Sequence, residues 1–256
     1  MKARYIFFMI SIVVFLMVPG VSYANPSDAP LLNDMISSNV TEVDNASNIL
    51  VLVNKENYLP KDYVPEDLRS VNLPRVKGKD QLRDEAASAL EAMFQDAEKA
   101  GHILYARSGY RSYSRQSAIF YDYVKKYGRT LTETFSAPPG MSEHQTGLAM
   151  DISSKAVNYA LVRKFGELPE GIWVKENSWQ YGFIIRYSKD KTDITKYSYE
   201  PWHLRYVGRD AAKVIHKKDI TLEEYLDSVK WKDETFGYSK HQIIWELPNP
   251  MIPLFA

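Results

Sequence analysis

Two short stretches of the chain carry the residue types that metal-assisted chemistry needs. Residues 142–152 read SEHQTGLAMDI and residues 199–207 read YEPWHLRYV. They contain two histidines, His144 and His203, and one aspartate, Asp151. Two imidazoles and a carboxylate form a donor set that suits zinc and leaves a fourth position for water. Bound zinc lowers the pKa of that water to about 7 and polarises a carbonyl group.

Glu200 is the candidate acid–base group of such a site, because it lies three residues before His203. A carboxylate that is not a ligand can take a proton from water and pass it to a leaving amine. The combination indicates metal-assisted amide hydrolysis. Each residue also has an ordinary alternative: a histidine can be a hydrogen-bonded core residue, Asp151 can cap a turn, and Glu200 can be a solvated charge. The helical His-Glu-x-x-His signature of many zinc proteases is absent.

A strand over residues 147–153 would present Asp151 on a face with small neighbours, because alternate side chains of a strand share a face. The small neighbours leave room beside the carboxylate, and a turn at residues 145–147 lets His144 fold back toward it. The opposite face is apolar and is expected to enter the core. That face consists of Leu148, Met150 and Ile152.

A second strand, over residues 202–207, would place His203 and Arg205 on one face. Strict alternation would put Glu200 on the opposite face from His203. We therefore expect a bend or bulge at Pro201, a residue that suits a strand start but not a helix interior. The expected core face of this strand consists of Trp202, Leu204 and Tyr206.

The remaining elements predict an α+β fold with a central antiparallel sheet flanked by helices. Apolar residues at three- and four-residue steps predict helices over residues 80–100, 114–127, 209–217 and 222–229. Apolar runs predict further strands over residues 49–53, 103–107 and 183–187. Helices that come early and strands that come late, without regular alternation, favour α+β.

Composition excludes several classes of protein. The chain has 256 residues, of which 45% are hydrophobic and 25% charged, as in ordinary globular domains. Lys plus Arg equals Asp plus Glu at 32 each, so no basic excess indicates nucleic acid. Cysteine is absent, which excludes disulfides, thiolate metal sites and a cysteine nucleophile. Any metal must be bound by His, Asp or Glu.

The N-terminus has the layout of a secretory signal peptide, predicted over residues 1–24. Lys2 and Arg4 precede an apolar run, and small residues lead to a cleavage position after Ala24. The alternative is a membrane anchor, but a spanning helix needs about 20 apolar residues and this run is shorter. We expect the protein outside the cytoplasmic membrane, secreted or associated with the cell wall, with membrane contact only through an uncleaved signal segment.

The rest of the chain is predicted to form one domain with short extensions. Residues 25–46 are rich in Asn, Ser, Asp and Pro and are predicted to be a linker. A single domain is expected over residues 47–247, which is a usual domain size. Residues 248–256 are expected to form a C-terminal tail.

The two chemical stretches resemble the signature of the zinc peptidases that include the VanY-type D-alanyl-D-alanine carboxypeptidases. The matching patterns are S-x-H-x-x-G-x-A-x-D from residue 142 and E-x-x-H from residue 200. The likeness extends roughly from Leu52 to Lys213. Further similar segments, in the same order, are SGYRS at 108–112 followed by Gln116, PG at 139–140, YGFIIRY at 181–187, and residues 200–208.

The resemblance implies one zinc ion per chain with His144, Asp151 and His203 as ligands and Glu200 as catalytic base. It also implies the hedgehog/D,D-peptidase-like zinc peptidase fold. Arg111 is expected to face the substrate. Its guanidinium offers two parallel donors to a C-terminal carboxylate or stabilises the oxyanion of a tetrahedral intermediate, and both roles stay open.

Further side chains are predicted near the substrate by the same resemblance. Gln116, Ser142 and Tyr187 are expected to line the pocket, with a role as local hydrogen-bond partners as the alternative. Aromatic side chains are expected in the core or stacked on a ligand, and the core is preferred for Trp202. For three other aromatic residues both positions stay open: Trp173, Trp179 and Tyr181.

The resemblance implies a carboxypeptidase that removes the terminal D-alanine from peptidoglycan stem peptides. An L,D-carboxypeptidase acting on tetrapeptides would use the same machinery, and the sequence does not distinguish the two. A third hypothesis is a wall-binding or signalling domain with a structural zinc, as in the hedgehog-like relatives. The presence of both Glu200 and Arg111 favours an enzyme. The oligomeric state is not indicated by the sequence.

Overall fold

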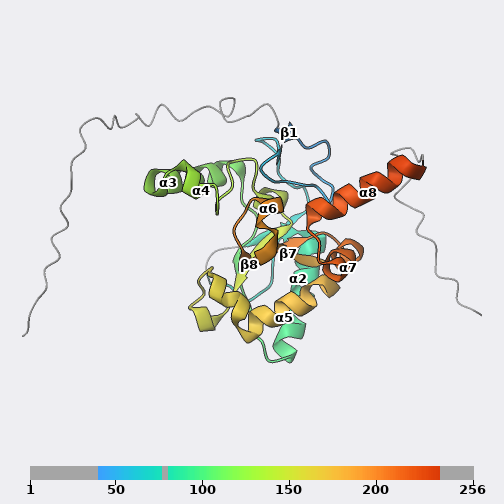
Figure 1. The fold of residues 1–256 in the computed structure, drawn as a ribbon. Helices are drawn as coiled ribbons and strands as arrows, with labels where there is room; N and C mark the ends of the chain where they lie inside the picture. Colours follow the sequence, from blue (N-terminus) through green and yellow to red (C-terminus); the bar gives the residue numbers. More distant parts are fainter. Residues whose placement is uncertain (1–39, 77–79, 237–256) are drawn as a thin grey trace, which may run out of the picture. The chain divides into compact units, whose positions relative to one another are not determined.

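A four-stranded antiparallel sheet lies at the centre of the structure, which is a computed structural model that describes residues 40–76 and 80–236. Its strand order is β5-β6-β8-β7, and Figure 1 labels two of its strands, β7 and β8. The four strands are β5 (Tyr105–Ser108), β6 (Ala149–Ser153), β7 (Phe183–Tyr187) and β8 (Glu200–Tyr206). The two strands predicted to carry metal-binding side chains, β6 and β8, are adjacent, and Asp151 lies directly opposite His203 in their register.

Helices flank this sheet, and the α+β prediction is confirmed. The α-helices are α2 (Asp84–Lys99), α3 (Tyr113–Tyr127), α4 (Arg129–Thr132), α5 (Pro169–Asn177), α6 (Thr192–Thr195), α7 (Arg209–Lys218) and α8 (Leu222–Phe236). Short 3-10 helices are η2 (Glu143–Thr146), η3 (Lys155–Val157), η4 (Arg163–Glu167), η5 (Ser178–Tyr181) and η6 (Lys189–Lys191). None of the helices in the described part of the chain combines the length and hydropathy that a membrane span requires.

Helix α2 supplies much of the core, as its apolar periodicity predicts. Its buried face packs with the apolar faces of β6 and β8, where Leu148, Met150, Ile152 and Leu204 are buried. The buried residues of α2 are Ala86, Ala87, Leu90, Met93, Phe94 and Ala97. The helix begins at Asp84 and not at residue 80, because residues 81–83 pair with another short strand.

Two small two-stranded sheets complete the described strands. β3 (Leu68–Ser70) pairs antiparallel with β4 (Gln81–Arg83), and β1 (Thr41–Glu42) pairs parallel with β2 (Asn57–Tyr58). β1 lies within the predicted linker, residues 25–46, whose part before residue 40 lies outside the described residues. Val43 and Ala46 of this segment pack against the core. The predicted signal peptide and the C-terminal tail also lie outside the described residues.

The strand predicted over residues 49–53 is wrong. These residues form a turn and an extended segment without ladder partners. The carbonyl oxygens of Ile49 and Val51 instead accept hydrogen bonds from Nη2 of Arg205, at 3.0 and 2.7 Å. A side chain from the central sheet thus takes the place of a neighbouring strand.

The bulge expected at Pro201 is confirmed. Between β7 and β8, Ile185 pairs with Leu204, but Tyr187 pairs with Glu200. Two steps along β7 therefore correspond to four steps along β8, so β8 holds extra residues around Pro201. This irregularity allows Glu200 and His203 to lie on the same side of the sheet.

Candidate metal and active site

Three side chains from η2, β6 and β8 converge on one point. One nitrogen each from His144 and His203 and a carboxylate oxygen of Asp151 all lie within 4.8 Å of one another. His144 lies on η2, and Gly147 then turns the chain into β6 with a left-handed φ of 68°. A side chain at Gly147 would also collide with Leu68, at 2.8 Å from its Cδ2. The turn therefore fixes how His144 faces the strand that carries Asp151.

The hydrogen bonds of the two histidines define which nitrogen of each ring is free. Nδ1 of His144 donates to the carbonyl of Gly109 at 2.8 Å, so Nε2 is left facing Asp151 Oδ2 at 3.3 Å. Nε2 of His203 donates to Glu143 Oε2 at 3.3 Å, so Nδ1 is left facing Asp151 Oδ1 at 3.1 Å. Asp151 Oδ1 is buried and has no hydrogen-bond partner among the described residues. Two free nitrogen lone pairs that meet an unsatisfied carboxylate fit a divalent cation such as zinc.

At His144 and Asp151 the electrostatics favour the protonation states that metal binding requires. Burial, followed by the nearby Arg111, lowers the pKa of His144 and keeps that ring neutral. Burial alone would raise the pKa of Asp151, but His144 and His203 hold it well below its usual range. Burial would lower the pKa of His203, yet the neighbouring carboxylates of Asp151 and Glu143 raise it to about 9. A metal-free site therefore attracts a proton to His203, and a bound cation would compete with that proton.

Glu200 lies beside the metal donors without being one of the three. Its Oε2 is 3.9 Å from His203 Nδ1, and the residue is buried, with 8% of its surface exposed. Burial raises the pKa of its carboxyl group to about 8. A carboxyl group with a pKa close to neutral can both take up and give back a proton during one reaction cycle.

A cavity of about 390 Å³ opens beside this cluster. All the side chains that the sequence analysis predicted for the site line it: Arg111, Gln116, Ser142, His144, Asp151, Tyr187, Glu200 and His203. Further lining residues, which the analysis did not assign to a site, include Tyr123, Phe135, Leu161 and Tyr197. The structure thus brings together residues that are up to about ninety positions apart in the chain.

Arg111 is held in this cavity by neutral partners. Its Nη1 donates to Gln116 Oε1 at 2.6 Å and its Nη2 donates to Ser108 Oγ at 2.9 Å. Gln116 is itself fixed, because its amide donates to the carbonyl of Ala137 at 2.5 Å. Burial lowers the pKa of Arg111, since neither hydrogen-bond partner carries a compensating charge. The cavity therefore presents a positive charge that an anionic group of a ligand would balance.

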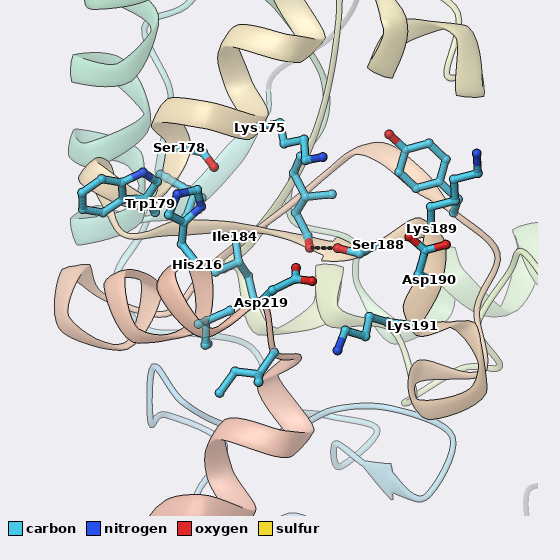
Figure 2. A pocket seen from close by; sticks show the side chains of 15 residues that line it. Lys175, Ser178, Trp179, Ile184, Ser188, Lys189, Asp190, Lys191, His216 and Asp219 are labelled. Atoms are coloured by element: carbon cyan, nitrogen blue, oxygen red, sulfur yellow. Dashed lines mark hydrogen bonds between the residues drawn. The ribbon is translucent and has the colours of Figure 1, made fainter.

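The aromatic side chains divide between this cavity and other positions. Trp202 packs partly against the core and also lines the cavity, and the ring of Tyr187 lies 4.9 Å from that of His203. Trp179 lines a different cavity, of about 280 Å³, where its ring stacks on His216 (Figure 2). None of the predicted site residues lines that second cavity. Trp173 and Tyr181 pack against the core.

Glu143 is a charged residue of this site that the sequence analysis did not assign. It is fully buried, and its Oε1 accepts hydrogen bonds from Arg186 Nε at 2.8 Å and Arg205 Nη1 at 2.7 Å. Its other oxygen accepts from His203. Its place in the sequence could have indicated it, because this carboxylate lies between two predicted site residues, Ser142 and His144.

Comparisons with known proteins agree with this site. The family model of the VanY D-alanyl-D-alanine carboxypeptidases matches residues 79–209. YodJ of Bacillus subtilis (strain 168) is 52% identical over 195 residues, which are 73% of this chain and 70% of that protein. The chain belongs to the VanY/LdcB family of carboxypeptidases.

Two solved structures are similar to more than two thirds of this chain. The LdcB LD-carboxypeptidase is 50% identical with a TM-score of 0.71, over 73% of this chain and 90% of that one. A vancomycin-resistance D,D-pentapeptidase VanY, solved with Zn(II), is 36% identical with a TM-score of 0.58, over 71% of this chain and 99% of that one. Zinc in that relative and the donor set formed here by His144, Asp151 and His203 support zinc dependence.

Proposed function

We propose that this protein is a secreted zinc carboxypeptidase that removes the C-terminal D-alanine from peptidoglycan stem peptides. The observation that carries the proposal is the shared cavity. It contains a cation-binding donor set, a non-ligand carboxyl group 3.9 Å from one of the donors, and a buried guanidinium without a charged hydrogen-bond partner. Those three features are what hydrolysis of a terminal amide next to a free carboxylate requires.

The metal would be held by Nε2 of His144, Nδ1 of His203 and the carboxylate of Asp151. When bound there, zinc supplies Lewis-acid polarisation of the amide carbonyl and makes a water molecule more acidic. Glu200 accepts the proton of the attacking water and then donates it to the departing amine of D-alanine.

Arg111 would hold the end of the peptide. Two donors in a fixed plane match the two oxygens of a carboxylate, and the hydrogen bonds to Gln116 and Ser108 keep the guanidinium in one orientation. Gln116 therefore acts mainly by positioning Arg111. Ser142 and Tyr187 line the same cavity and complete its polar and aromatic wall.

The second candidate function is an L,D-carboxypeptidase that acts on tetrapeptide stems. The similarity to LdcB, a protein named as an LD-carboxypeptidase, favours it, whereas the similarity to a D,D-pentapeptidase favours the first candidate. The same zinc, base and arginine would serve both reactions. In the two reactions the residue that precedes the cleaved bond has the opposite configuration, and the substrates differ in length by one residue.

Mass spectrometry of synthetic stem peptides incubated with residues 25–256 decides between the candidates. A D,D-enzyme shortens the pentapeptide by one alanine and leaves the tetrapeptide intact, and an L,D-enzyme shortens the tetrapeptide. Addition of a chelator should abolish either reaction. A protein that binds zinc and muropeptides but forms no product would instead support the third hypothesis, a domain with a structural zinc.

Two variants test the assigned roles. Glu200→Ala is expected to retain zinc and lose turnover, because the base does not bind the metal. His203→Ala is expected to lose both, because a metal ligand is removed. Normal turnover in Glu200→Ala would end the assignment of Glu200 as the base.

A further inference from the structure

Glu143 orients one of the proposed metal ligands. Its Oε2 lies 3.3 Å from Nε2 of His203, and this hydrogen bond directs the free lone pair of Nδ1 toward Asp151. A carboxylate that accepts the second ring N–H of a metal-binding histidine fixes the tautomer and the ring orientation, and it makes the imidazole a stronger donor. The position and the charge of Glu143 therefore matter for how tightly this site binds a cation.

Two buried arginines hold Glu143, and each needs a further partner. Arg186 and Arg205 both donate to Oε1 of Glu143, and the side chains of all three are fully buried. One carboxylate cannot balance two buried guanidinium groups, and an uncompensated buried charge is unfavourable. The other partners of the two arginines therefore decide whether Glu143 can keep accepting the hydrogen bond from His203.

Glu223 supplies the second carboxylate partner of Arg186. The guanidinium donates from Nη1 to Glu223 Oε2 at 2.8 Å and from Nη2 to Glu223 Oε1 at 2.6 Å, a two-point ion pair. Asn54 adds a weak hydrogen bond of 3.4 Å to the same carboxylate. The negative charges of the two carboxylates then balance the positive charges of the two guanidinium groups in the cluster. Arg205 donates its remaining hydrogen bonds to backbone carbonyls.

Glu223 belongs to α8, which begins at Leu222 and therefore follows the residues 79–209 that match the family model. The start of this helix is fixed by a capping box. The Thr221 N–H donates to Glu224 Oε2 at 2.8 Å, and the Glu224 N–H donates to Thr221 Oγ1 at 3.2 Å. Leu222 is buried in a second apolar cluster with α7. The hydrogen bonds between Glu223 and Arg186 therefore join the first turn of α8 to β7.

We propose that α8 is part of the metal centre, and that Glu223 positions His203 through Arg186 and Glu143. The inference rests on the proposed metal site. Without the carboxylate of Glu223, Arg186 pairs with Glu143 alone, which draws that carboxylate from His203 and leaves a surplus positive charge close to the cation. Both effects weaken metal binding. Loss of an outer partner of a metal ligand typically lowers affinity by about 10- to 100-fold, and Glu223 is one contact further out, so we expect a loss of about tenfold.

The experiment compares Glu223→Gln with Glu224→Gln in the full mature chain. The two substitutions remove the same charge from neighbouring positions of one helix. Gln at position 224 retains the capping box, and among the described residues the one ion pair of Glu224 is with Lys191, at 3.6 Å. Zinc affinity is measured by competition with a chelator, and the visible absorption of the cobalt-substituted protein reports the ligand geometry. Glu223→Gln should bind zinc about tenfold more weakly and shift the cobalt spectrum, whereas Glu224→Gln should match the wild type in both.

A double-mutant cycle separates positioning from a general loss of stability. If Glu223 acts through Glu143, Glu223→Gln should have little further effect on zinc affinity in a Glu143→Gln background. An equal loss in both backgrounds, or an unchanged zinc affinity in Glu223→Gln alone, would overturn the proposal. A wild-type protein that binds no zinc would overturn the proposed function itself, so the two failures can be told apart.

Discussion

The carboxyl group of Glu200 is expected to oppose stability in the metal-free protein, and Glu200→Gln should reveal this. Burial raises its pKa from 4.5 to about 8. Each pKa unit corresponds to about 1.4 kcal/mol, so ionised Glu200 destabilises the folded state by at most about 5 kcal/mol. Because the folded protein retains the proton to a higher pH than the unfolded chain, stability is lost as pH rises from about 4.5 through about 8. Gln keeps the size of the side chain and does not ionise.

Urea unfolding of the metal-free proteins at several pH values measures this effect. At pH 4 the carboxyl group is protonated in both the folded and the unfolded wild type, so the difference in the free energy of unfolding between the two proteins reports only the substitution itself. By pH 9 the free energy of unfolding of the variant should have risen by several kcal/mol relative to that of the wild type. Zinc-loaded protein is the control, because a nearby dication stabilises the ionised carboxylate. Zinc should therefore reduce the difference in the free energy of unfolding between the variant and the wild type at high pH. Stability curves that stay parallel from pH 4 to pH 9 would refute the reasoning, since they would mean that Glu200 is not desolvated.

Three further outcomes follow from the described contacts. Arg111→Lys should raise KM for a stem peptide about tenfold or more at unchanged zinc affinity, because an ammonium cannot reproduce the planar fork; a fall in kcat at constant KM would instead assign Arg111 to the oxyanion. Asp151→Asn should lower zinc affinity by at least about a hundredfold in a chelator competition, because it removes the anionic ligand, and unchanged affinity would argue against the site. Met93→Ala, at a fully buried core position, should lower the free energy of unfolding by about 2–5 kcal/mol while zinc affinity stays the same.

The elements with regular side-chain periodicity could be predicted from the sequence. The strand β7 was predicted with its observed bounds, and α3 was predicted to within one residue at each end. The prediction for α2 was within one residue at the C-terminal end but four residues too long at the N-terminal end. Alternation in β6 identified both the core face and the face of Asp151. The bulge in β8 followed from the position of Pro201 between Glu200 and His203, since a regular strand would have separated the two side chains.

The features that depend on distant partners could not be predicted in this way. The apolar residues 49–53 have the composition of a strand, but a guanidinium about 155 positions away occupies their carbonyls. Glu143 lies on a short 3-10 turn, where neither strand nor helix periodicity indicates which side chains are buried. The strands β1 to β4 have two or three residues each, which is too short for any periodic signal.

The extra residues in β8 set a limit on how this active site can be altered. In an uninterrupted strand, side chains on one face are separated by about 7 Å along the backbone, whereas Oε2 of Glu200 comes within 3.9 Å of the ring of His203. Removing two residues between them, the number by which β8 exceeds β7 here, would restore a regular ladder with β7 and make Glu200 and His203 adjacent, on opposite faces of the sheet. The same deletion would move Glu200, the proposed proton acceptor, away from the proposed metal site, so a more regular strand would lower the catalytic activity.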